Sequence, residues 1–191
     1  SLPYYTGGVV ESSEDLIMMF PEDFKAKHNI DVYTQTEVLK INRAEKTITV
    51  KDLKNGETRN EAYDKLVLAT GTEPVMPGSI EGIHSLHVFT IRNVVDIERL
   101  QAKLDEESTK NIAVVGGGFI GVEVAENLRK IGKEVTLIEG TKQILAPYDY
   151  DMVQILHKEL DDNGITLHVS ATVTAIESKQ VKAVKDGKEF T

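Results

Sequence analysis

A glycine-rich segment in this chain lies between two regular hydrophobic patterns. Gly116, Gly118 and Gly121 fit the spacing G-x-G-x-x-G. The apolar run 111–115 before them predicts a buried strand, and residues 119–131 after them predict a helix. A strand that passes through such a turn into a helix is typical of a dinucleotide-binding unit. The sequence therefore predicts an α/β fold with a parallel sheet.

Each glycine has a physical role in this predicted turn. Gly116 lets the chain turn sharply out of the strand, and Gly118 lets a pyrophosphate approach the backbone. Gly121 lets the helix pack closely on the strand, and the amino terminus of the helix offers free N–H groups to phosphates. The alternative is a glycine-rich turn in an unrelated α/β protein.

An acidic residue lies where such a fold would hold a ribose. The expected strand 134–138 ends at Glu139, 18 positions after Gly121. A carboxylate there could accept hydrogen bonds from the ribose hydroxyls of a dinucleotide. Because Glu139 would repel a 2′-phosphate, the pattern favours NADH over NADPH.

The remaining patterns predict two regions with different secondary structure. Before residue 72 we expect a loop at 2–8, helices at 12–20 and 21–28, and an antiparallel β-meander of strands 37–42, 47–51 and 57–63. The run 65–69 is continuously apolar, which predicts a strand buried on both faces. After the link 72–78 we expect helices at 92–107 and 151–163, and strands at 165–169, 171–177 and 180–184.

Composition excludes several classes of protein. The formal net charge of −9 argues against nucleic acid as the main partner, because phosphate binding requires clustered Lys and Arg. No apolar run approaches the roughly 18 residues that span a bilayer, so we expect no membrane segment. The chain holds no cysteine, which excludes a disulfide scaffold or thiolate metal site within it. The histidines are scattered, and we expect no metal site.

Several motifs of the chain resemble those of the pyridine nucleotide–disulfide oxidoreductases, and occur in the same order along the sequence. The resemblance is greatest to the branch of NADH oxidases, NADH peroxidases and coenzyme A–disulfide reductases. Residues 116–126 are similar to the family signature G-G-G-[YF]-I-G-x-E-x-A-E. Residues 65–78 are similar to a family segment that contacts FAD. Residues 2–8, with the sequence LPYYTGG, match the stretch just after the redox-active cysteine in this branch. The resemblance thus implies a cysteine immediately before Ser1.

The resemblance also implies roles for individual residues. Phe119 would cover the flavin until nicotinamide displaces it, Ile120 would line the nicotinamide pocket, and Glu123 would bind the carboxamide. From pattern alone, Glu123 is a first-turn glutamate favoured by the helix dipole, and Phe119 is apolar helix surface. The full expected set is Gly116, Gly117, Gly118, Phe119, Ile120, Gly121, Glu123 and Glu139 for NADH, and Val38, Thr70 and Gly71 for FAD.

The resemblance implies part of an FAD-binding domain at 1–78 and a Rossmann-like NAD-binding domain at 79–191. We expect an inactive fragment of an FAD-dependent NADH oxidoreductase. Its parent would pass hydride from NADH through FAD to a cysteine centre, and then to a disulfide, peroxide or oxygen. That parent is expected to be a cytoplasmic homodimer that dimerises through a further domain and acts on a small molecule. The alternative is a stand-alone NADH-binding module without catalysis.

Overall fold

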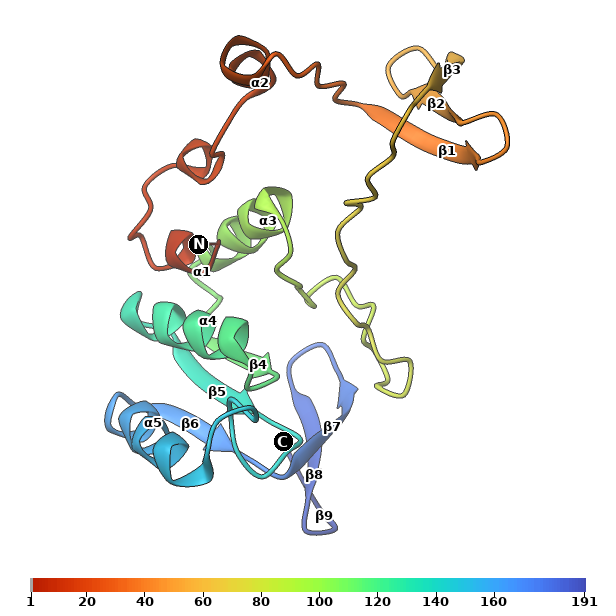
Figure 1. The fold of residues 1–191 in the computed structure, drawn as a ribbon. Coiled ribbons are helices and arrows are strands. Elements are labelled where there is room, and N and C mark those ends of the chain that lie inside the picture. Colours follow the sequence, from red (N-terminus) through yellow and green to blue (C-terminus); the bar gives the residue numbers. More distant parts are fainter. Residues whose placement is uncertain (1) are drawn as a thin grey trace. The chain divides into compact units, whose positions relative to one another are not determined.

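The computed structural model describes residues 2–191 and divides the chain into two compact units, drawn by sequence colour in Figure 1. One unit contains the residues up to Leu16 together with Glu73–Thr191, and the other is Ile17–Thr72. The expectation of a loop at residues 2–8 is wrong, because α1 (Leu2–Thr6) is a short helix. It packs against α3 (Val94–Leu104) and α4 (Phe119–Lys130), which explains why the first residues belong with the later part of the chain.

The larger unit is built on a three-stranded parallel sheet. Its strands are β4 (Asn111–Val115), β5 (Glu134–Ile138) and β6 (Ile165–His168), in the order β4-β5-β6. The helix α4 connects β4 to β5, and α5 (Tyr150–Asp162) connects β5 to β6. Val115 pairs with Ile138, and Ile138 pairs with His168, so the three strands end together at one edge of the sheet. The expected α/β fold with a parallel sheet is confirmed.

One apolar cluster holds this unit together. The helices contribute residues at spacings of three and four, which place them on one face, and the strands contribute their inward residues. Burying each large side chain of this kind contributes about 1.5–3 kcal/mol relative to leaving it exposed. The buried members are Ile97, Leu100, Leu104, Val124, Ala125, Leu128, Val135, Leu137, Ile144, Leu145, Val153, Leu160 and Ile165.

A second sheet in the same unit is antiparallel. It consists of β7 (Ala171–Ile176), β8 (Val181–Lys185) and β9 (Lys188–Phe190), in the order β7-β8-β9. Asp186 and Gly187 both have positive φ values, 52° and 73°, as a tight turn with the right twist requires. The sequence patterns did not predict β9, which is only three residues long.

The unit Ile17–Thr72 contains the expected β-meander. Its strands β1 (Thr36–Asn42), β2 (Thr47–Asp52) and β3 (Thr58–Ala62) pair antiparallel in the order β1-β2-β3. The helix α2 (Pro21–His28) has the expected bounds. The helix expected at 12–20 is reduced to one 3-10 turn, η1 (Ser13–Leu16).

The strand expected at 65–69 does not form. No strand among residues 2–191 pairs with this segment, and Val67 and Leu68 are 85% and 66% exposed. A strand that is buried on both faces needs neighbours that satisfy its backbone and cover its side chains. Its apolar sequence therefore remains extended and exposed. None of the helices described in residues 2–191 is long and apolar enough to cross a membrane.

Candidate functional site

The glycine-rich turn connects β4 to α4 at the edge where the parallel strands end. Gly116 has a φ of 107°, a conformation that side-chain-bearing residues rarely adopt. A Cβ atom on Gly121 would lie 1.9 Å from the carbonyl oxygen of Gly116, so this close approach requires glycine. A Cβ atom on Gly118 would meet nothing within 4 Å, which leaves open space beside the amino terminus of α4. The turn thus offers its backbone to a ligand.

Glu139 follows β5 and binds this turn directly. Its Oε2 accepts the N–H of Gly117 at 2.6 Å, and its Oε1 accepts the N–H of Thr141 at 2.7 Å and the Thr141 hydroxyl at 2.8 Å. Burial raises the pKa of the Glu139 carboxyl, but hydrogen bonds from Thr141, Gly117 and Gly140 outweigh burial and hold the pKa below 4.5. Glu139 is therefore a charged acceptor at neutral pH, fixed beside the turn.

The loop after Glu139 supports the turn from its other side. The N–H of Leu145 donates to the carbonyl oxygen of Gly117 at 2.7 Å. The side chain of Ile144 is fully buried, and its Cγ2 would lie 2.7 Å from a Cβ on Gly117. Leu145 has a φ of 47°, a left-handed conformation that costs a leucine about 1–2 kcal/mol. The sequence did not predict that Thr141, Ile144 and Leu145 support the turn and Glu139.

The first turn of α4 presents apolar side chains to solvent. Phe119 and Ile120 are 55% and 58% exposed. The Phe119 ring lies edge-on to the ring of Tyr148, with 5.9 Å between centroids. Glu123 is half-buried one turn further along the helix. All the residues expected to contact NADH thus lie in one unit, on the turn, on the first turns of α4 and just after β5.

The residues expected to contact FAD lie in the other unit. Val38 is in β1, and Thr70 and Gly71 follow the exposed apolar segment. All three are exposed, and Gly71 has a φ of 74°. These three residues are therefore accessible to a ligand.

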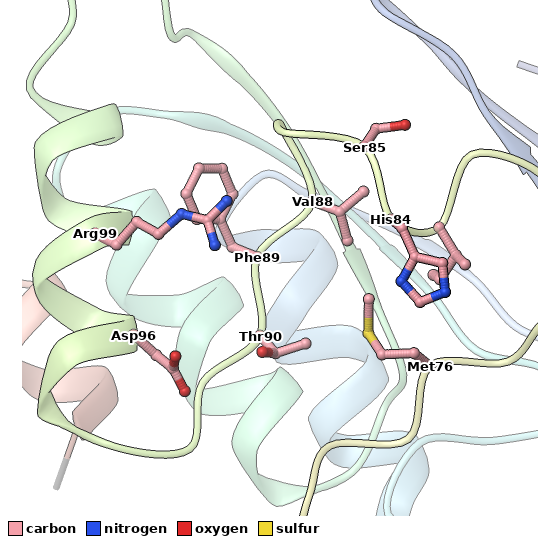
Figure 2. Close-up of a pocket in the computed structure, with 9 residues that line it drawn as sticks. Met76, His84, Ser85, Val88, Phe89, Thr90, Asp96 and Arg99 are labelled. Atoms are coloured by element: carbon pink, nitrogen blue, oxygen red, sulfur yellow. The ribbon is translucent and has the colours of Figure 1, made fainter. Parts of the chain in front are cut away.

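A separate pocket of about 210 Å³ contains none of the expected cofactor residues (Figure 2). Arg99 reaches from α3 toward Phe89, with its guanidinium carbon 5.0 Å from the ring centroid. Asp96 accepts the N–H groups of Arg92 and Asn93, which caps α3. These polar groups serve the fold. Among the residues described, 2–191, no cluster of three or more His, Cys, Asp or Glu could hold a metal ion.

The model of one protein family, described as pyridine nucleotide-disulphide oxidoreductase, matches residues 4–191. This chain belongs to the pyridine nucleotide-disulphide oxidoreductases. Enzymes of this family use FAD and NAD(P)H. An NADH oxidase from Methanocaldococcus jannaschii is 38% identical over 193 residues, which cover 100% of this chain and 43% of the relative. A coenzyme A disulfide reductase from Staphylococcus haemolyticus is 33% identical over 180 residues, 94% of this chain and 40% of the relative.

Solved structures of family members share the fold. Reduced CoADR-RHD from Bacillus anthracis matches with a TM-score of 0.91 and 42% identity, over 99% of this chain and 34% of that one. The water-forming NADH oxidase from Lactobacillus brevis, bound to NADH, matches with a TM-score of 0.85 and 30% identity, over 99% of this chain and 42% of that one. The chain thus spans less than half the length of these relatives.

Proposed function

We propose that this chain is part of an FAD-dependent NADH oxidoreductase of the NADH oxidase or coenzyme A–disulfide reductase type. In this proposal residues 79–191 are the NADH-binding domain, and residues 1–78 are a segment of the FAD-binding domain. The observation that carries it is the charged Glu139 carboxylate, held 2.6 Å from the Gly117 nitrogen beside the open space at Gly118.

The residues at the turn fit an extended dinucleotide. The N–H groups at the start of α4 and the bare backbone of Gly118 would bind the pyrophosphate. Glu139 would accept the hydroxyls of the adenosine ribose. Glu123 would bind the nicotinamide carboxamide, and the exposed side chains of Phe119 and Ile120 would border the ring.

The redox chemistry belongs to the bound nicotinamide and flavin, which carry the hydride. The chain's own residues bind and orient these groups. Phe119 would shield the flavin face from water until nicotinamide displaces its ring. Val38, Thr70 and Gly71, which are exposed, would contact FAD. In the parent protein, the cysteine expected immediately before Ser1 would take part in the reduction of a disulfide, peroxide or oxygen.

The proposal extends to the discrimination of NADH from NADPH. A 2′-phosphate would bring negative charge against the Glu139 carboxylate, which the hydrogen bonds of the loop keep ionised. An engineered form of the Lactobacillus brevis enzyme, bound to NADPH, carries five substitutions. One of them replaces an aspartate by alanine, and two introduce arginine. These changes support an acidic residue as the barrier to NADPH in this family.

The test is a titration of the chain with NADH and NADPH. We expect tighter binding of NADH, and we expect Glu139→Ala to reduce that preference about tenfold, the effect of a charge-assisted hydrogen bond. The matched control is Glu126→Ala, which removes an exposed carboxylate from α4 and should leave the preference unchanged. Equal relative affinities in the wild type and Glu139→Ala would refute the assigned role.

A second measurement tests the catalytic part of the proposal. The chain has no cysteine, so it should not consume NADH with a disulfide acceptor, with or without added FAD. Clear turnover would contradict the expected cysteine centre. A coding sequence that extends upstream into a cysteine and a second G-x-G-x-x-G would favour the enzyme over a stand-alone module. A small-molecule substrate, a homodimeric parent and a cytoplasmic location belong to the same proposal.

A further inference from the structure

His157 has no role in the proposed chemistry, yet it contacts the loop beside the nucleotide site. Its half-buried ring extends from α5, and its Nε2 accepts the backbone N–H of Ile144 at 3.3 Å. A ring nitrogen accepts a hydrogen bond only when it carries no proton, so the neutral ring with its proton on Nδ1 is the form that makes this contact.

Ile144 and its neighbour Leu145 in turn contact the glycine-rich turn at Gly117. The buried Ile144 side chain packs so closely on Gly117 that a Cβ there would lie 2.7 Å from it. The next residue, Leu145, donates its N–H to the Gly117 carbonyl at 2.7 Å, and Glu139 accepts the Gly117 N–H at 2.6 Å. Residues of the loop 139–145 thus form hydrogen bonds with both the N–H and the carbonyl oxygen of Gly117. His157 in turn accepts a hydrogen bond from Ile144 of this loop.

We infer that His157 is a positioning residue for the nucleotide site, whose neutral ring holds Ile144 and Leu145 against the turn that Glu139 binds. The inference rests on the proposed NADH binding. A protonated ring would present an N–H at Nε2 to the Ile144 N–H, and the two donors cannot form a hydrogen bond. The loop would then lose its support, and NADH affinity would fall as the pH is lowered.

Other ionisable groups occur on the elements around His157. The segment 139–149 between β5 and α5 carries Glu139, Lys142, Tyr148 and Asp149. The strand β6 ends at His168, and Asp161 lies one turn further along α5. Burial lowers the pKa of His157 below 6.5. Burial and the nearby Lys185 lower the pKa of His168 as well. Histidine is the side chain whose ordinary pKa lies within the pH range of the experiment, so the experiment must separate His157 from His168.

The experiment measures the dissociation constant of NADH for the 191-residue chain between about pH 5 and 8. We expect wild-type affinity to fall about three- to tenfold on acidification, the effect of one lost hydrogen bond. His157→Gln keeps an acceptor that cannot be protonated, so it should bind as the wild type does near pH 8 and lose this pH dependence. His168→Gln is the matched control and should keep the wild-type profile.

Two outcomes would overturn the inference. One is the same pH dependence in the wild type and in His157→Gln, and the other is a flat profile in the wild type. A measurement without ligand adds a check on the contact: the Ile144 amide resonance should shift with His157 titration in the wild type and stay constant in His157→Gln. A chain that binds no NADH at any pH, while the Ile144 resonance still titrates, would refute the proposed function and leave the contact established.

Discussion

The two compact units differ sharply in how much apolar surface they bury. The unit that contains the parallel sheet has thirteen buried residues in one cluster. Among residues 17–72, all of which the structure describes, Val50 is the only buried hydrophobic residue. Many other apolar side chains of that unit are exposed, including Met18 at 99% and Val67 at 85%.

The difference shows what each kind of element needs from the rest of a protein. The segment from α3 to β6 brings its own helices to cover the parallel sheet, so a continuous stretch of sequence builds both the core and the glycine-rich turn. The meander β1-β2-β3 pairs its backbone but has little to cover its faces. Hydrogen-bonded strands without a packed face contribute little stability. The parallel-sheet unit should therefore be much the more stable.

Truncating a buried side chain in the central strand of each unit's main sheet should give the largest difference in unfolding free energy between the two units. Leu137 lies fully buried in β5, and Leu137→Ala should lower the free energy of unfolding by about 2–5 kcal/mol. Val50 is the buried residue of β2, and Val50→Ala should cost about 1.5 kcal/mol and affect the meander alone. Thermal unfolding followed by NMR resonances of both units would report these effects. Val95→Ala, at a 71% exposed site in α3, is the control.

Equal shifts of one shared transition in Leu137→Ala and Val50→Ala would contradict this contrast, because they would show that the two units unfold together.

Substituting one glycine in each unit should give the next largest difference in stability between the two units. Gly121→Ala would place its Cβ 1.9 Å from a backbone oxygen, so the turn must shift, at a cost of about 1–3 kcal/mol with loss of NADH binding. Gly56→Ala in the β2–β3 turn meets no atom within 4 Å, and its φ of 78° should cost about 1 kcal/mol. Calorimetry and NADH titration measure both. Unchanged NADH affinity in Gly121→Ala would refute the role of the close approach.

The sequence predicted the features that depend on local spacing. The glycine-rich turn and Glu139 followed from their positions between β4, α4 and β5, and the strand patterns before residue 72 predicted the β-meander of β1, β2 and β3. Features that depend on distant contacts were not predictable in this way. The run 65–69 has the composition of a buried strand, but composition does not supply neighbouring strands. Likewise, the His157 contact to a backbone N–H requires no particular residue at 144.

The helix α1 was missed for the same reason, and it offers the third prediction. Asn127 of α4 is fully buried, and its Oδ1 would lie 2.1 Å from a Cβ on Gly7. Gly7→Ala should therefore displace α1 from α4 and cost about 1–2 kcal/mol, since a side chain can move more easily than a backbone. Asn127→Ala removes the obstructing amide, so the double variant should recover part of this loss.

Unfolding free energies of Gly7→Ala, Asn127→Ala and the double variant form a complete cycle. Additive effects would show that the two residues do not touch, and would argue against placing α1 in the unit of the parallel sheet. A coupling that offsets the cost of Gly7→Ala would support that placement.

The smallest expected effect concerns α2, which has no buried residue and depends on local interactions. Asp23 accepts the Phe20 N–H at 3.3 Å and pairs with Lys27 at 3.1 Å. Hydrogen bonds lower the pKa of Asp23 below 3.8, the largest effect coming from Lys27 and the next from the N–H of Phe20. Because the folded pKa lies below the unfolded one, the stabilisation is present above about pH 3.8 and is lost as the pH falls through the lowered value.

Helical chemical shifts of residues 21–28 should therefore weaken slightly at acid pH, and Asp23→Asn should show the weakened value at neutral pH. The matched control is Glu126→Gln in α4, where the exposed pair with Lys130 has the same i,i+4 spacing. Since α4 is held by its buried face, its shifts should not change measurably. Equal changes in both helices would mean that packing protects α4 no better than local pairs protect α2, which would remove the distinction between the two units.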